Sequence, residues 1–218
     1  MMDKREIIVR RVAQEFKDGD VVNLGIGMPT EASNYVAPGV QIWLQAESGM
    51  IGCGPEVEPG NEDPDLIDAS GAFITAMPGA AFFDSTLSFA MIRGGHVDIT
   101  VIGALQVDEA GNLASYMIPG KRMMGMGGAM DLVVGAKRVI IAMEHLTKTG
   151  DFKLMKRCTM PLTGIACVDL VVTDLCVLEF VNGQLHLREC FPGVSPQQVL
   201  EASQAHIEVP AHVGVMKV

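Results

Sequence analysis

Short apolar runs that alternate with helical patterns most constrain the fold of this chain of 218 residues. Residues 97–104 and 139–143 are rich in β-branched side chains and have the length of buried strands. Residues 4–17 instead place Val12 and Phe16 at helical spacing, with charged residues between the apolar ones. Because strands that alternate with helices form parallel sheets, we expect an α/β fold with an open, mostly parallel sheet flanked by helices.

Turn and capping residues place the remaining elements. Further strands are expected at residues 21–24, 40–46, 71–77 (closed by Pro78-Gly79), 113–118 and 168–172. An antiparallel hairpin joins residues 175–181 to 184–188 through Asn182-Gly183. Helices begin at Thr30 or Ser33, at Asp84 or Ser85 with Leu87, Phe89, Ala90 and Ile92 facing inward, and at Ser195. No linker interrupts the sequence, so a single domain over residues 1–218 is expected.

Composition excludes several classes of function. A net charge of −10 argues against nucleic acid and anionic membrane surfaces as partners. The sequence has no long apolar stretch and no signal-peptide pattern at its start. The 5 cysteines form no C-x-x-C pair, and reduced, buried thiols in a cytoplasmic protein explain them best. No spacing typical of a metal site occurs, so no metal is expected.

The strand expected at residues 40–46 ends in Glu47, and Ser48-Gly49 follows at once. Open α/β sheets bind ligands at the carboxyl ends of their strands. Glu47 is therefore a candidate catalytic residue, although most Glu residues are solvated surface charges. The acidic residues between 56 and 65 lie in loop-like sequence and are explained most simply as solvated charges.

Two glycine-rich segments are further candidates. After the strand at residues 21–24, Gly25 and Gly27 form a G-x-G-x-P pattern that departs from the dinucleotide-binding fingerprint. It is either a tight turn or a loop whose backbone approaches a ligand. Residues 119–131 contain Gly127 and Gly128 in a long segment without periodicity, either a connector or an anion-binding loop, and the length favours function. Lys121 and Arg122 within it are solvated charges or contacts to phosphate.

Three segments in this order carry a resemblance to a known family: residues 23–30 (NLGIGMPT), 45–49 (QAESG) and 125–132 (GMGGAMDL). Together they resemble the B (beta) subunit of the 3-oxoacid coenzyme A transferases, and the likeness runs over nearly the whole chain. The resemblance implies a CoA-transferase-like open α/β subunit, similar to the sugar-phosphate isomerase fold.

The resemblance also implies site residues, partners and chemistry. Glu47 matches the family's catalytic Glu, although Ala46 and Ser48 replace the usual Ser and Asn beside it. Gly128 and Ala129 match the oxyanion-binding turn, and Asn23 matches an active-site Asn. The implied activity moves coenzyme A from an acyl-CoA such as succinyl-CoA or acetyl-CoA to a 3-oxoacid such as acetoacetate. It proceeds by ping-pong chemistry through a glutamyl–CoA thioester and needs no cofactor, because coenzyme A is itself a substrate. The implied partner is an A (alpha) subunit in a hetero-oligomer such as α2β2.

Two other hypotheses stay open at this point. A sugar-phosphate isomerase or ligand-sensing protein of similar fold would need convergent basic side chains for the phosphate. A non-catalytic partner subunit would need no intact Glu47.

The residues expected to bind substrate or coenzyme A are Asn23, Gly25, Gly27 and Gly127.

Overall fold

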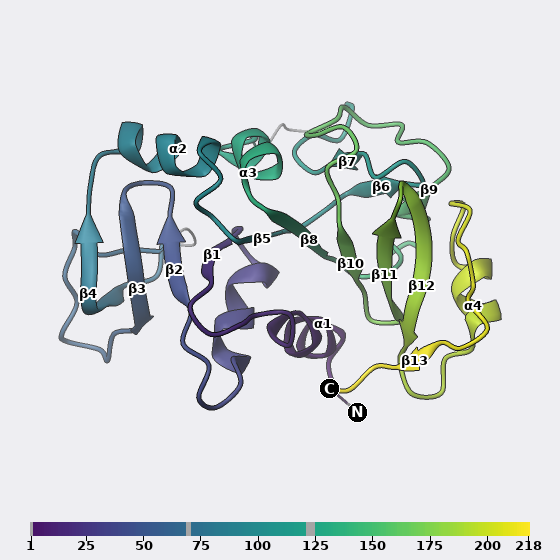
Figure 1. Cartoon of the computed structure of the whole chain (residues 1–218), viewed down its shortest axis with the longest axis horizontal. Coiled ribbons are helices and arrows are strands. Elements are labelled where there is room, and N and C mark those ends of the chain that lie inside the picture. Colours follow the sequence, from purple (N-terminus) through teal and green to yellow (C-terminus); the bar gives the residue numbers. More distant parts are fainter. Residues whose placement is uncertain (1, 69–70, 121–124) are drawn as a thin grey trace.

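The computed structural model describes residues 2–68, 71–120 and 125–218 (Figure 1). Its helices are α1 (Lys4–Ala13), the 3-10 helix η1 (Met28–Tyr35), α2 (Ser85–Arg93), α3 (Ala129–Gly135) and α4 (Pro196–Glu201). Its strands are β1 (Val21–Leu24), β2 (Trp43–Ala46), β3 (Met50–Glu56), β4 (Ile74–Phe82), β5 (Ile99–Ile102), β6 (Gln106–Asp108), β7 (Leu113–Ala114), β8 (Arg138–Ala142), β9 (Leu154–Met155), β10 (Leu170–Val172), β11 (Cys176–Val181), β12 (Gln184–Cys190) and β13 (Gly214–Val215).

One 10-stranded sheet in the order β13-β12-β11-β10-β8-β5-β1-β2-β3-β4 forms the framework, and β7-β6-β9 form a second, small sheet. The central strands β10, β8, β5, β1 and β2 are parallel, which confirms the expected open α/β class. The antiparallel hairpin of β11 and β12 was also expected, and β10 pairs with β11 antiparallel as well. The opposite side, where β2, β3 and β4 are antiparallel, was not, because Gly52, Gly54 and Pro55 make β3 resemble a loop.

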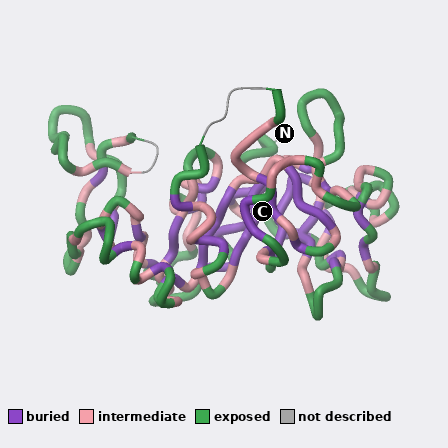
Figure 2. Tube along the Cα trace, turned by 90° about the horizontal axis from the view of Figure 1, so that it is seen from above, coloured by how far each residue is buried: buried purple, intermediate pink, exposed green. Residues whose placement is uncertain are grey.

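Helices cover both faces of the sheet, and each face has its own core. Figure 1 shows α2 and α3 side by side along the top of the view, with α1 and η1 below. On the α1 face, Ile8 and Val12 pack against Val22 and Ile140. On the α2 face, Ile92 packs in the cluster that contains residues of α3, α4 and the small sheet. Buried residues concentrate along the central strands between these layers (Figure 2).

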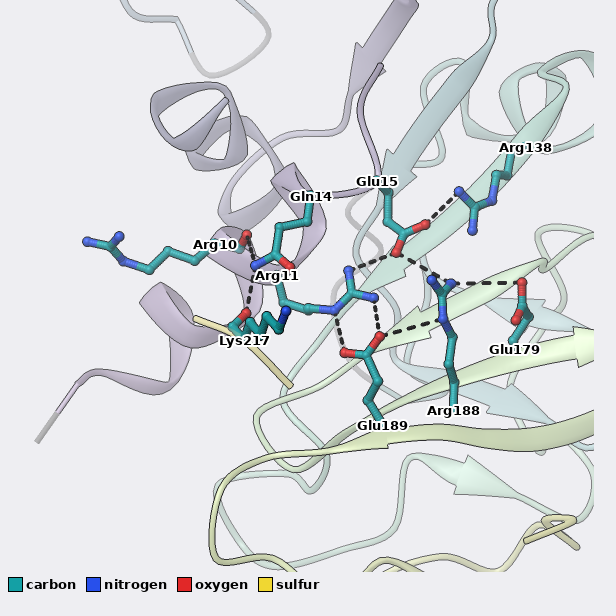
Figure 3. A network of polar contacts seen from close by, with 9 residues as sticks. All are labelled: Arg10, Arg11, Gln14, Glu15, Arg138, Glu179, Arg188, Glu189 and Lys217. Carbon is teal, nitrogen blue, oxygen red and sulfur yellow. Dashed lines mark hydrogen bonds and ion pairs between the residues drawn. The ribbon is translucent and has the colours of Figure 1, made fainter. Parts of the chain in front are cut away.

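The α1 face also buries a network of ion pairs (Figure 3). Arg11 is 3% exposed and donates to both carboxylate oxygens of Glu189, with each distance 2.7 Å. Its Nη1 lies 2.7 Å from Glu15, which also meets Arg138 at 2.7 Å. Arg188 lies 3.5 Å from Glu15 and from Glu189. The network joins the end of α1 to β8 and β12, which are far apart in sequence.

Several expectations about the helices and strands were wrong, including the strand expected at residues 113–118, which ends at Ala114. The first helix ends at Ala13 rather than near residue 17. Strand β4 continues through Pro78-Gly79 to Phe82, because it lies at the outer edge of the sheet, where a missing N–H disrupts no ladder. Leu87, expected to face inward from α2, is 51% exposed, and the polar Ser88 is buried beside Ile92 instead.

Several local signals gave the right structure. Asp84 caps α2 by accepting from the amide of Leu87, and Ser195 forms a capping box at the start of α4. Asn182 and Gly183 both have positive φ in the turn between β11 and β12. All of the cysteines are free, as expected. No helix in the described ranges has the length and apolar character needed to cross a membrane.

Candidate active site

Glu47 is the first residue of the tight turn between β2 and β3. The amide of Gly49 donates to the carbonyl of Ala46 at 3.1 Å, which closes the turn directly after the strand. Gly49 has φ +132°, and a Cβ there would lie 1.9 Å from the carbonyl oxygen of Phe83. Only glycine fits this turn. The Ser48-Gly49 sequence therefore ends β2 at a fixed point and presents the half-buried Glu47 at its carboxyl end.

The side chain of Asn23 meets Glu47 from the neighbouring strand β1. Asn23 is 2% exposed, and its Nδ2 lies 3.4 Å from Glu47 Oε2. The same Nδ2 donates to Gln45 Oε1 at 2.8 Å and to the Gln45 carbonyl at 3.1 Å. Gln45 Nε2 in turn donates to Ser88 Oγ at 2.8 Å. The carboxylate of Glu47 is thus contacted by the neutral amide of Asn23, which is in turn held by Gln45.

The glycines of the predicted oxyanion loop lie against the other oxygen of Glu47. A Cβ on Gly128 would stand 3.2 Å from Glu47 Oε1 and 3.0 Å from Phe89 Cζ. A Cβ on Gly127, which has φ +50°, would stand 3.8 Å from the same oxygen. The backbone therefore approaches the carboxylate closely because these positions carry no side chains. Asn23, Glu47 and Gly128, predicted from three separate segments, come together at one place.

The two backbone amides expected to bind an oxyanion differ in availability. The amide of Ala129 donates to the carbonyl of Met126 at 3.0 Å, so it already has an acceptor. The amide of Gly128 has no acceptor in the part of the chain that the structure describes. Gly128 is therefore the better placed donor in this conformation.

Gly25 and Gly27 serve the backbone. The amide of Gly25 donates to the carbonyl of Val101 at 2.8 Å, and a Cβ on Gly25 would lie 3.1 Å from that oxygen. Gly27 has φ +92° and precedes η1 with open space around its Cα. The turn between β1 and η1 is enough to account for a glycine at both positions. That these glycines bind substrate stays a prediction. Lys121 and Arg122 lie outside the described residues.

A cavity of about 370 Å³ opens beside Glu47, a size typical of small-molecule sites. Asn23, Gln45 and Cys53 line it together with residues of the 3-10 helix and of the second half of β3. Burial raises the pKa of the Cys53 thiol to about 11, so this thiol is protonated at neutral pH and is a poor nucleophile. Among the carboxylates of the described lining, Glu47 is the candidate nucleophile because the Asn23 amide and the Gly128 backbone lie beside it.

The charges around the cavity are acidic. Besides Glu47, its described lining residues include Glu31, Glu56 and Asp68, and none of them is basic. Within the same described ranges no cluster of three or more His, Cys, Asp and Glu side chains is placed to hold a metal ion. Glu31 is partly neutralised by an exposed ion pair with Arg5. A phosphate group therefore finds no counter-charge on this wall.

A second Glu at the carboxyl end of a parallel strand has different surroundings. Glu144 follows β8, and the adjacent His145 is 1% exposed. The ring of His145 contacts Thr173 Oγ1 at 3.0 Å and Ser203 Oγ at 3.2 Å. Burial lowers the pKa of His145 to about 4, so the ring is neutral at physiological pH. This histidine is a satisfied core residue, and neither side chain lines the cavity.

Sequence reasoning missed Gln45 and Ser88. Gln45 is 4% exposed and Ser88 is 0% exposed, although both are polar. A Gln within an apolar strand and a Ser within the apolar stripe of a helix were visible in the sequence. Neither residue is recognisable from the sequence alone, because the two are hydrogen-bond partners 43 residues apart.

Comparisons with known proteins identify the family and the fold of this chain. A family model described as coenzyme A transferase matches residues 5–202. The chain is 50% identical over 216 residues to the beta subunit of the acetate CoA-transferase of Escherichia coli (strain K12), covering 99% of both chains. It is 50% identical over 205 residues to the B chain of the succinyl-CoA:3-ketoacid coenzyme A transferase of Helicobacter pylori, covering 94% of this chain and 99% of that one.

The fold is similar to that of a solved acyl-CoA transferase apoenzyme from Escherichia coli O157:H7. The TM-score is 0.76 at 21% identity, over 99% of this chain. The matched region is 43% of that longer chain, so this chain corresponds to less than half of it. At this identity the likeness concerns the fold.

Proposed function

This chain belongs to the coenzyme A transferase family, and we propose that it carries the nucleophile of a two-subunit enzyme that exchanges coenzyme A between carboxylic acids. Glu47 is the proposed covalent carrier. The observation that supports it best is the position of its carboxylate, between the Asn23 amide and the backbone of Gly128, on the wall of the cavity.

The chemistry follows from a carboxylate that is positioned and partly shielded from water. A Glu47 oxygen attacks the carbonyl carbon of the acyl-CoA and expels coenzyme A as a thiolate, leaving an acyl–glutamyl anhydride. The thiolate then attacks the glutamyl carbonyl, which releases the first acid and leaves a glutamyl–CoA thioester. The incoming acid reverses both steps and leaves as the new acyl-CoA, so one thioester is exchanged for another. Ping-pong kinetics are expected.

Each addition creates a tetrahedral oxyanion that needs a donor. The Gly128 amide is the first candidate, since it has no acceptor among the described residues. The Ala129 amide contributes only if its bond to Met126 opens. One oxyanion donor is worth about 2.7–4 kcal/mol in other acyl-transfer enzymes.

The proposed substrates are a 3-oxoacid such as acetoacetate and an acyl-CoA such as succinyl-CoA or acetyl-CoA. The named relatives support both kinds of donor, because one belongs to an acetate CoA-transferase and the other to a succinyl-CoA:3-ketoacid transferase. The acidic lining supports singly charged acids on this chain's side of the cavity. Exchange rates with acetate, acetoacetate and succinate as acceptors test this preference, and a preference for succinate contradicts it.

The proposed partner is a separate A subunit, in a hetero-oligomer such as α2β2. The relatives are named as beta or B subunits, and Ile26 is 73% exposed at the rim of the cavity. Because a single exposed apolar side chain is common on protein surfaces, the subunit names of the relatives are the main support for this proposal. Light scattering on the co-expressed chains measures the stoichiometry. We also propose a cytoplasmic location, which the free thiols support.

Mass spectrometry of the reconstituted complex tests the function. After incubation with an acyl-CoA in the absence of acceptor, the peptide that contains Glu47 is expected to gain the mass of coenzyme A as a thioester. Borohydride is expected to reduce this adduct to an alcohol. Glu144→Gln is the matched control, because Glu144 also follows a parallel strand but lies outside the cavity lining, and it should label normally.

Absence of an adduct, or an adduct on another residue, contradicts the proposal. Exchange activity of a Glu47→Ala complex supports the non-catalytic partner hypothesis instead. The sugar-phosphate isomerase hypothesis has no support from the family match or from the lining of the cavity.

A further inference from the structure

Three polar side chains form a row across neighbouring parallel strands on the α2 face. Asn23 of β1 is in register with Thr100 of β5, and on its other side it contacts Gln45 of β2. The exposures of Asn23, Thr100 and Gln45 are 2%, 0% and 4%. Apolar side chains are usual at such positions, since an unpaired polar group in a core costs about 1–3 kcal/mol. The burial of three polar side chains beside the proposed nucleophile therefore needs a functional explanation.

Donor and acceptor roles in this row are fixed one after another, from Ser88 through Gln45 to Asn23. The hydroxyl of Ser88, on α2, donates to the carbonyl of Ala46 at 3.4 Å. Its single hydrogen is then in use, so Ser88 Oγ can only accept from Gln45, and Gln45 Nε2 donates to it at 2.8 Å. Gln45 must consequently turn its Oε1 away from Ser88 and toward β1.

The orientation of the Gln45 side-chain amide determines the orientation of the Asn23 side-chain amide. Because Gln45 presents Oε1, the Asn23 amide must present Nδ2, and this bond is 2.8 Å long. Nδ2 carries a second hydrogen, which is shared between the Gln45 carbonyl at 3.1 Å and Glu47 Oε2 at 3.4 Å. With the amide reversed, the carbonyl oxygen of Asn23 would face the carboxylate of Glu47, and the two would repel each other.

We propose that Ser88 and Gln45 are positioning residues, which fix the amide of Asn23 so that its N–H group faces Glu47. Neither residue touches the reacting atoms. They act through Asn23, which holds Oε2 and leaves Oε1 directed toward Gly128. This inference rests on the proposed role of Glu47.

The other end of the row leaves two polar atoms unpaired within the described ranges. Asn23 Oδ1 and Thr100 Oγ1 are both buried, and neither has a hydrogen-bond partner among the described residues. The amide of Asn23 therefore makes all of its recorded hydrogen bonds through Nδ2. Its orientation is set by Gln45 and Glu47.

A double-mutant cycle on the complex with the A subunit tests the inference. Ser88→Ala is expected to lower kcat by about 10-fold, since small misplacements of catalytic groups have effects of this size. The KM for acyl-CoA should change by less than about 2-fold, because the variant leaves ground-state binding in place. Ser88→Thr keeps the hydroxyl and is expected to recover most of the rate. Thr100→Val, which removes a buried hydroxyl without a recorded partner from the same row, is the matched control.

The decisive measurement is the effect of Ser88→Ala in an Asn23→Ala background. If Ser88 acts through Asn23, the second substitution lowers kcat no further. An equal loss of rate in both backgrounds, or an unchanged kcat in Ser88→Ala alone, overturns the inference. If Ser88→Ala does not assemble, the same cycle with Gln45→Met gives the answer. The CoA adduct on wild-type Glu47 is scored separately, so a failure of the proposed function is distinguishable from a failure of this inference.

Discussion

The two faces of the sheet bury polar groups in opposite ways. On the α1 face, the carboxylates of Glu15 and Glu189 are balanced by Arg11 and Arg138 at 2.7 Å (Figure 3). On the α2 face, Glu47 meets amides and glycine backbone, and no described cation forms an ion pair with it.

The difference separates a structural carboxylate, Glu15, from the proposed nucleophile, Glu47. A guanidinium group occupies the lone pairs of a carboxylate and neutralises its charge, so Glu15 is a poor nucleophile. Neutral amides orient Glu47 and leave its charge in place. The environment of a carboxylate therefore identifies its role better than its position in the sequence does.

The largest expected effect is the loss of transfer in Glu47 variants. Glu47→Ala should lower kcat by at least about 10⁴-fold, as removal of a covalent nucleophile does in other enzymes. Glu47→Asp retracts the carboxylate by one methylene group and should lower kcat by about 10²-fold. Steady-state exchange assays on the complex measure both. Near-normal turnover of Glu47→Asp would show that this carboxylate is not the nucleophile.

Arg11→Met should lower the stability of the protein and leave its rate of transfer unchanged. It leaves Glu189 without its bidentate partner, and breaking a buried ion pair costs about 3–5 kcal/mol of stability. Chemical denaturation measures this loss, while kcat per assembled complex should stay near the wild-type value. Arg10→Met is the control, because the Arg10–Glu6 pair on the same helix is more exposed and should contribute less than about 1 kcal/mol. Equal losses in the two variants would remove the distinction between the faces.

A smaller effect is expected for Gly128→Ala. The new Cβ would stand 3.2 Å from Glu47 Oε1 and 3.0 Å from Phe89 Cζ, so either group must shift by a few tenths of an ångström. We expect kcat to fall by about 10-fold with little change in unfolding temperature. Gly103→Ala, whose Cβ would meet nothing within 4 Å, should leave both quantities unchanged. A fully active Gly128→Ala enzyme would show that close backbone approach is not required.

The smallest predicted effect concerns acid. Although burial alone would raise the pKa of Glu15, Arg11 and Arg138 hold it below the ordinary value of 4.5. A depressed carboxyl pKa stabilises the folded state above pH 4.5, and this contribution is lost as the pH falls through the folded-state pKa. Melting temperatures between neutral and acid pH should therefore drop less steeply in Glu15→Gln than in the wild type. Identical slopes would mean that Glu15 does not contribute to acid sensitivity.

Much of the framework was predictable because it depends on local patterns. Strand β1 has the expected bounds, and the hairpin at Asn182-Gly183 and the caps at Asp84 and Ser195 form as expected. These features depend on a few neighbouring residues. Glu47 and Gly128 were candidates from a strand end and a glycine-rich segment, whereas Asn23 was found by resemblance, and their meeting in space depends on the order of the parallel strands.

The remainder required tertiary contacts. Strand β3 contains Gly52, Gly54 and Pro55, and it is a strand because β2 and β4 pair with it on both sides. The burial of Ser88 follows from Gln45, which is 43 residues away in sequence. No local pattern contains this information.

Strand β4 forms one outer edge of the large sheet, and Pro78 lies within it. The edge of a sheet normally offers a row of amide groups to any extended chain that meets it. Pro78 has no amide hydrogen, and Gly79 turns the backbone to φ +90° at the next residue. A further strand would therefore meet an interrupted ladder at the middle of this edge, which opposes aggregation of neighbouring molecules through their backbones.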